Sequence, residues 1–151
     1  LTAWQALVEK AKLTAGQKVF IQAGSGGVGT IAIQLAKHLG ATVATTTSAE
    51  NFDLVKNLGA DVIIDYRKDD FENILKDYDV VLNSQDKKSL EKSLRILKPN
   101  GKVISISGPP DPDFAIQIKG NWFLKIVMRM LSVSVRKKAK QLNVNFSFLF
   151  M

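Results

Sequence analysis

The chain has 151 residues, of which 46% are hydrophobic, so it is long and apolar enough for one domain with a buried core and too apolar for a disordered chain. It contains no cysteine and one histidine, which excludes disulfides and thiolate metal sites and argues against a zinc site built from this chain alone. The net charge of +7 lies entirely in the seven basic residues after Phe114, because the preceding residues are balanced with 14 basic and 14 acidic side chains.

The first predicted helix follows from an apolar face at helical spacing, formed by Trp4, Leu7, Val8 and Ala11. We expect Trp4 to lie in the core. A second helix is predicted to begin near Val28 and to be stopped by Gly40. Its expected buried face comprises Val28, Ile31, Ala32, Leu35, Ala36 and Leu39.

Short β-branched and aromatic runs predict five strands, at residues 18–22, 41–46, 61–65, 79–83 and 102–107. Further helices are predicted at residues 52–58, 71–75 and about 90–97, the last ended by the turn at 99–101. Continuous apolar strands separated by helices of about ten residues predict a parallel sheet that is covered on both faces.

Three prolines in residues 109–112 exclude a helix or an inner strand there. A long apolar and basic helix is expected at about 120–142, and a sixth strand at 144–149. The fold class is therefore predicted as α/β, a doubly wound Rossmann fold with strand order 3-2-1-4-5-6.

The basic helix at 120–142 has two interpretations. It could bind a membrane surface or nucleic acid, or it could pack on the sheet or on a second subunit with its charges in water. We favour packing and disfavour membrane and nucleic-acid partners. A homo-oligomer is also expected, because dimerisation would cover an exposed apolar face.

Both ends of the chain are apolar: Leu1–Leu7 opens inside a helical pattern, and Phe146–Met151 closes the chain. Because natural termini are usually polar and exposed, we interpret the chain as a piece of a longer protein. No apolar run reaches the roughly 18 residues of a spanning helix and no secretory signal is visible, so a cytoplasmic location is expected.

The pattern Gly24-x-Gly26-x-x-Gly29 fits a dinucleotide-binding fingerprint. The first glycine allows a tight turn, the second lets the pyrophosphate approach the backbone, and the third lets helix and strand pack closely. The helix that follows points free N–H groups and its positive dipole end toward the phosphates. Its position after a strand and before a helix supports this interpretation over a purely structural turn.

The end of the second strand indicates which dinucleotide binds. An NAD-preferring site usually has an acid there for the ribose 2′-hydroxyl, but this segment reads Thr45-Thr46-Thr47-Ser48-Ala49-Glu50. Glu50 comes late enough to fall in the next helix's first turn, where Ser48 is a natural N-cap. Without an acid to repel a 2′-phosphate, NADP(H) is favoured over NAD(H), although no arginine or lysine stands there to attract it.

Several motifs together resemble the medium-chain dehydrogenase/reductase superfamily, in its zinc-independent quinone oxidoreductase-like branch. The resemblance runs from Leu1 to about Gly108 and is carried by Leu1–Leu7, Ala23–Gly29, Gln34–Lys37, Leu58–Asp61, Ile64–Tyr66 and Leu97–Lys102. It implies that residues 1–151 are the cofactor domain of a two-domain enzyme whose GroES-like domain would form the other wall of the substrate cleft. It also implies hydride transfer to a quinone or to an activated alkene or carbonyl, with no metal.

The resemblance further implies cofactor contacts by position. Ser25, Gly26, Gly27 and Val28 would hold the diphosphate, beside Gly24 and Gly29. Thr46, Thr47, Ser48 and Asn51 would face the adenosine 2′-phosphate, flanked by Tyr66. Asn83 and Ser84 would line the ribose, and the nicotinamide would be approached by Ser107, Gly108, Phe148, Leu149 and Phe150.

Two departures from the family pattern weaken individual contacts. Asn51 stands where these reductases often have a lysine for the 2′-phosphate, and Asn83-Ser84-Gln85 replaces an Asp-Ser-Val-Gly type of turn. No residue is nominated as a catalytic acid. Asp65 is interpreted as part of a solvated loop, and the lone His38 as a solvent-facing residue at a helix end.

Other function classes are weighed against this interpretation. A short-chain dehydrogenase needs Tyr-x-x-x-Lys, which neither Tyr66 nor Tyr78 provides, and a methyltransferase normally keeps an acid after strand two. A zinc-dependent alcohol dehydrogenase-like domain and a non-catalytic NADPH-sensing module remain alternatives. We expect this chain alone to bind NADPH without reducing a quinone.

Overall fold

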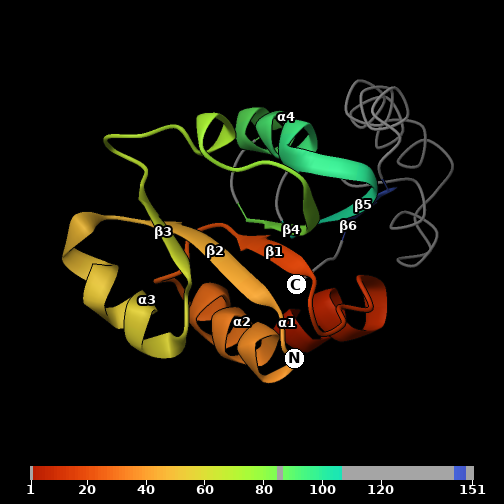
Figure 1. Cartoon of the computed structure of the whole chain (residues 1–151), viewed down its shortest axis with the longest axis horizontal. Coiled ribbons are helices and arrows are strands. Elements are labelled where there is room, and N and C mark those ends of the chain that lie inside the picture. Colours follow the sequence, from red (N-terminus) through yellow and green to blue (C-terminus); the bar gives the residue numbers. More distant parts are fainter. Residues whose placement is uncertain (1, 85–86, 107–144, 149–151) are drawn as a thin grey trace, which may run out of the picture.

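The computed structural model describes residues 2–84, 87–106 and 145–148, and these form one six-stranded parallel sheet (Figure 1). The strand order is β3-β2-β1-β4-β5-β6, so the predicted doubly wound α/β topology is confirmed, including the sixth strand. The strands are β1 Lys18–Ile21, β2 Thr42–Thr47, β3 Val62–Asp65, β4 Tyr78–Asn83, β5 Leu97–Ser105 and β6 Asn145–Phe148.

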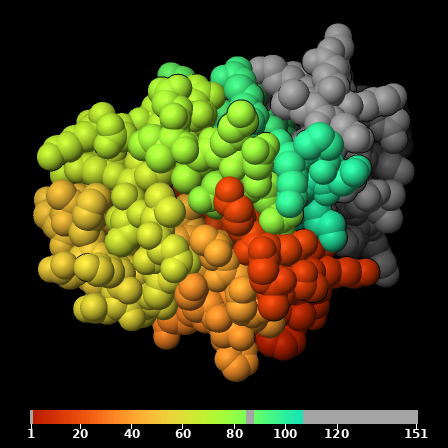
Figure 2. Space-filling view, in the orientation of Figure 1, coloured from red at the N-terminus to blue at the C-terminus, as the bar shows by residue number. Residues whose placement is uncertain are grey.

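Helices cover both faces of this sheet. One face carries α1 (Thr2–Trp4), the π-helical η1 (Gln5–Lys10), α2 (Gly27–His38) and α3 (Phe52–Leu58), while η3 (Phe71–Asn73) and α4 (Lys87–Ile96) cover the other (Figure 1). A short 3-10 turn, η2 (Ala49–Asn51), leads into α3. In the space-filling view the red N-terminal segment lies against the orange α2 (Figure 2).

Successive strand residues point to opposite faces and build two separate cores, because side chains alternate along a strand. Val19 and Ile21 of β1 join the core under α2, together with Ile33 of that helix. Phe20, between them in sequence, belongs to the opposite core with Leu90 and other residues of α4. The near-continuous apolar strands are thus explained by burial on both sides.

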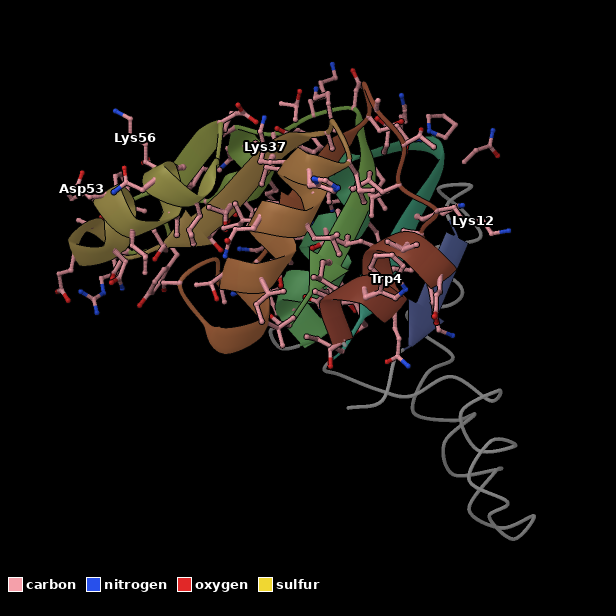
Figure 3. All side chains as sticks on the ribbon, turned by 90° about the horizontal axis from the view of Figure 1, so that it is seen from below. Trp4, Lys12, Lys37, Asp53 and Lys56 are labelled. Carbon is pink, nitrogen blue, oxygen red and sulfur yellow. The ribbon has the colours of Figure 1, made fainter. Side chains whose placement is uncertain are left out.

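The N-terminal helix differs from its prediction. Trp4 is 48% exposed, and the buried residues of this segment are Ala3, Ala6 and Leu7 (Figure 3). Residues 5–10 are wound as a π-helix, in which the amide of Ala11 donates to the carbonyl of Ala6 at 2.9 Å. The wider π-helical turn changes which residues face the sheet. The prediction that Trp4 is buried, which assumed α-helical spacing, was therefore wrong.

The buried face of α2 also differs from the predicted one. Ile31 is 56% exposed, whereas Ile33 is fully buried with Ala32, Ala36 and Gly29. At 3.6 residues per turn these four lie on one stripe, and Ile31 lies on the far side of the helix. The exposed position of His38 at the end of α2 is as expected.

The junction between α4 and β5 lies earlier than predicted. The helix ends at Ile96, and β5 begins at Leu97, which pairs with Tyr78 before the register shifts. Residues 99–101, expected to end the helix, belong to this irregular start of the strand, where Asn100 adopts a φ of 68°. A strand bulge of this kind leaves no simple periodic signal. The predictions for residues 109–112 and 120–142 lie outside the described residues.

Within the described ranges, no helix combines the length and hydropathy that crossing a bilayer requires.

Two isoleucines on α2 give a matched test of this packing. Ile33→Ala removes a fully buried side chain and is expected to lower the free energy of unfolding by about 2–5 kcal/mol. Ile31→Ala, at an exposed position of the same helix, should change it by less than about 0.5 kcal/mol. Urea unfolding of both variants measures this, and equal costs would contradict the assigned face of α2.

Candidate cofactor-binding site

Buried polar side chains gather where the strands end. Because all strands are parallel, these ends share one edge of the sheet, which is where open α/β sheets bind ligands. The strand-end polar residues that are buried are Gln22, Thr45, Thr46, Thr47, Ser48, Asp65, Asn83 and Ser105. Asp65 was expected in a solvated loop and is instead only 8% exposed, so that prediction was wrong.

The turn between β1 and α2 is held in an unusual backbone conformation. Ala23 has a φ of 52°, in the left-handed region that L-residues other than glycine seldom adopt. Its N–H donates to the hydroxyl of Thr46 at 3.2 Å, and its carbonyl accepts from the amide of Gly26 at 3.0 Å. These bonds fix the course of the chain as it enters α2.

Gly24 and Gly29 are required by packing alone. A Cβ on Gly24 would collide with the hydroxyl of Thr45 and would lie 3.0 Å from Cδ1 of Ile33. A Cβ on Gly29 would collide with the carbonyl oxygen of Ala23 and lie 2.8 Å from the Cα of Gly24. The first and third glycines of the fingerprint therefore let the turn and α2 pack tightly against β1 and β2.

Gly26 and Gly27 are different, because both are exposed and little surrounds them. A Cβ on Gly27 would meet no atom within 4 Å, and one on Gly26 would meet only the carbonyl of Ala23, at 3.3 Å. Gly26 is the N-cap of α2 and provides no side-chain cap. The first-turn N–H groups of α2 are thus left for a ligand, and the space that side chains would fill stays clear. These residues fit a bound diphosphate.

A pocket of about 680 Å³ adjoins this turn. It is lined by Gln22, Ala23, Ser25, Gly26, Thr46, Thr47, Tyr66, Arg67, Lys68, Asp69, Asp70, Phe71, Ser89 and Lys92. The hydroxyl of Thr47 donates to Oγ of Ser25 at 3.0 Å and so ties the end of β2 to the glycine-rich turn. The neighbouring Thr45 donates to the carbonyl of Ile21 at 2.6 Å, away from the pocket lining.

Three cationic residues in the pocket lining were missed by the sequence analysis: Arg67, Lys68 and Lys92. The cofactor prediction rested on the end of β2, where no arginine or lysine stands. The strand order 3-2-1 places the end of β3 beside the end of β2. The basic residues that follow Tyr66 in the sequence could therefore have been predicted to lie near the cofactor.

Arg67 lies over the ring of Tyr66, with its Cζ 5.6 Å from the ring centroid. Its Nη1 lies 3.6 Å from Oε1 of Glu50. Its hydrogen bond with the Tyr66 side chain raises the pKa of Arg67 further above its ordinary value. An arginine guanidinium is always cationic at neutral pH, and Arg67 lines the pocket, where its planar set of donors suits phosphate binding.

Lys92 on α4 is paired with Asp70, its Nζ lying 2.6 Å from Oδ2. The hydrogen bond from Lys92 lowers the pKa of Asp70, and the same bond raises the pKa of Lys92. Both groups therefore stay charged across the neutral range. This pair spans the pocket lining from the segment after β3 to α4.

The remaining predicted site residues are only partly brought together. Ser25, Gly26, Thr46, Thr47 and Tyr66 line the pocket, whereas Gly24, Gly27, Val28, Gly29, Ser48, Asn51, Asn83 and Ser84 do not. Asn51 donates from Nδ2 to the hydroxyl of Ser48 at 3.3 Å, next to the pocket. The side chain of Phe148 and the residues Ser107, Gly108, Leu149 and Phe150 lie outside the described part of the chain.

A buried polar network joins the ends of β1 and β4 to α4. Gln22, predicted only as part of a strand, donates from Nε2 to Oγ of Ser93 at 2.9 Å and accepts from the amide of Ser84 at 3.3 Å. Asn83 donates from Nδ2 to Oγ of Ser105 at 3.1 Å. Gln22 thereby holds Ser84, the residue predicted to line the ribose, at the end of β4.

Among the residues that the structure describes, no three His, Asp or Glu side chains gather as a metal site would require. The expectation that no metal is bound stays a prediction.

Comparisons with known proteins agree with this geometry. A family model described as zinc-binding dehydrogenase matches residues 27–144. The chain is 39% identical over 130 residues to the 2-methylene-furan-3-one reductase of Solanum lycopersicum, covering 83% of this chain and 33% of that protein. It is 38% identical, with the same coverage, to the chloroplastic NADPH-dependent alkenal/one oxidoreductase of Arabidopsis thaliana.

Solved structures include a similar fold in the quinone oxidoreductase from Coxiella burnetii, with a TM-score of 0.77 and 32% identity. The match covers 98% of this chain and 40% of that one. The chain thus spans about a third of the length of the curated relatives it matches.

The glycines of the turn predict two distinct phenotypes. Gly26→Ala is expected to change the free energy of unfolding by less than about 1 kcal/mol, because its Cβ would meet only the carbonyl oxygen of Ala23, at 3.3 Å, and a small shift relieves that contact, yet to weaken ADP binding. Gly29→Ala should destabilise the fold by about 1–3 kcal/mol, because its Cβ collides with backbone. Thermal unfolding and ADP titration of both variants measure these effects. Unchanged ADP affinity in folded Gly26→Ala would argue against a diphosphate at α2.

Proposed function

This chain belongs to the zinc-binding dehydrogenase family, and from that membership we propose that it is the NADP(H)-binding domain of an oxidoreductase that transfers hydride to a quinone or to an activated alkene or carbonyl. One observation carries the choice of cofactor. Gly26, at the exposed start of α2, lines the same pocket as the cations Arg67 and Lys68. The pocket adjoins the end of β2, which has no acidic residue.

The pocket supports a 2′-phosphate over a free 2′-hydroxyl. The end of β2 carries hydroxyl groups and no carboxylate that would repel a phosphate. Arg67 and Lys68 supply positive charge that attracts one. Acidic residues are also present: Asp70 is paired with Lys92, the exposed Glu50 lies 3.6 Å from Arg67, and Asp69 lines the pocket. The name of the Arabidopsis thaliana relative, an NADPH-dependent oxidoreductase, supports the same cofactor.

A bound nicotinamide would supply the hydride, and the proton that completes the reduction is assigned to no residue of this chain. Its own residues bind and orient. The N–H groups that start α2 at Gly27 would hold the diphosphate, Arg67 and Lys68 the 2′-phosphate, and Ser84 the ribose. Correct placement of the reacting atoms against a substrate then accounts for much of the rate. No catalytic acid is assigned to this chain.

Where the substrate binds is a proposal about the whole protein. The relatives are reductases about three times as long as the matched part, and the substrate pocket is proposed to form against a GroES-like domain that is separate from residues 1–151. A homo-oligomer, a cytoplasmic location and the absence of nucleic-acid or membrane partners stay predictions.

Replacing Arg67 tests the cofactor choice. The protein should bind NADPH more tightly than NADH, and Arg67→Leu should remove most of that advantage. Because a charge-assisted hydrogen bond to the 2′-phosphate is lost, NADPH affinity should fall about 10- to 100-fold. NADH affinity should change little, because its ribose carries no phosphate. Fluorescence titration with both cofactors measures this.

Arg95→Leu is the matched control, because Arg95 pairs with Glu72 at 2.9 Å and does not line the pocket. Its NADPH affinity should equal that of the wild type. Tighter binding of NADH than NADPH by the wild-type protein would overturn the proposed cofactor.

A further inference from the structure

The segment after β3, residues 66–70, is a preformed turn that we call the basic turn. Its first part is organised by the buried Asp65. The Oδ1 atom of Asp65 accepts from the amide of Arg67 at 3.0 Å, and its carbonyl accepts from the amides of Lys68 at 3.1 Å and Asp69 at 2.9 Å. Three successive amides are thus held by one residue that ends a strand of the sheet.

The far end of the basic turn is held by Asp70. Its Oδ2 accepts from Nζ of Lys92 at 2.6 Å, and its Oδ1 accepts from the amide of Glu72 in η3 at 3.3 Å. The following Phe71 is buried, with its ring centroid 4.7 Å from that of Phe20 in β1. The basic turn is therefore fixed to the sheet at one end and to α4 at the other, where η3 lies beside α4 (Figure 1).

Every residue of the basic turn lines the pocket, and so does Lys92. The Asp70–Lys92 pair is partly shielded, with side chains 33% and 23% exposed. Such a pair orders the basic turn before a ligand binds. The conformational entropy of the turn is therefore lost on folding and does not reduce the affinity for the ligand. The pair also neutralises a carboxylate that would otherwise repel a phosphate from the same pocket.

We propose that the Asp70–Lys92 pair is a positioning element that sets the preference for NADPH by holding Arg67 and Lys68 where they meet the 2′-phosphate. This inference rests on the proposed function. It assigns to α4 a part in cofactor selection, although the 2′-phosphate itself is expected at the ends of β2 and β3. Neither Asp70 nor Lys92 needs to contact the cofactor.

Two single variants separate positioning from simple electrostatics. Lys92→Met removes a positive charge from the pocket, and Asp70→Asn removes a negative one. If charge alone mattered, the first would weaken NADPH binding and the second would strengthen it. If the pair positions the basic turn, both variants free the turn and both should weaken NADPH binding by about three- to tenfold.

The experiment is a titration of each variant with NADPH and NADH. The expected result is a three- to tenfold weaker NADPH affinity in both variants, with NADH affinity unchanged within about twofold. The Asp70→Asn/Lys92→Met double variant should be no weaker than either single variant, because the pair acts as a unit. Amide hydrogen exchange in the ligand-free variants should be faster at Arg67, Lys68 and Asp69.

Lys37→Met is the matched control. It breaks a comparable ion pair, at 3.0 Å, between Lys37 on α2 (Figure 3) and Asp61, the residue before β3. Neither residue lines the pocket. Its ratio of NADPH to NADH affinity should equal that of the wild type.

Tighter NADPH binding by Asp70→Asn, or an unchanged cofactor ratio in both variants, would overturn the positioning role while leaving the proposed function intact. A wild-type protein without any preference for NADPH would instead overturn the proposed cofactor itself.

Discussion

The close approach of the β1–α2 turn to β2 is the constraint on which the rest of the site depends. Gly24 and Gly29 leave no room for a Cβ, so the turn lies directly on the sheet and α2 begins at its edge. The turn also requires Ala23 in a left-handed conformation, whose cost is offset in part by the hydrogen bond from its amide to Thr46. Tight packing on the inner side leaves the outer side, at Gly26, open for a ligand.

The second determinant is the order of the strands. A parallel sheet brings the ends of β2 and β3 to one edge, so two segments distant in sequence form one wall of the pocket. The end of β2 contributes hydroxyls, and the basic turn after β3 contributes cations. Neither segment alone would select a phosphate. Buried Asp65 shows how the fold connects the two roles, because it ends β3 in register with Thr47 and holds the amide of Arg67.

Local patterns were sufficient for the strands, the glycine fingerprint and the acid-free end of β2, because each depends on neighbours in sequence. The strand order followed from the alternation of strands and helices, which is typical of a doubly wound sheet. Features that depend on tertiary structure were not accessible in this way. Trp4 and Ile31 were placed in the core from α-helical spacing, but a π-helical turn and the orientation of α2 leave them exposed. Arg67 and Lys92 enter the pocket only through the packing of β3 and α4, which no local motif encodes.

We propose that one dinucleotide bridges the glycine-rich turn and the basic turn. The decisive measurement is of amide chemical shifts while NADPH is added to the whole chain. Large shifts are expected in residues 26–29 and 66–70, saturating together, with small shifts around Asp53 on the outer side of α3 (Figure 3). Saturating shifts that leave either segment unaffected would show that no single dinucleotide bridges the two turns.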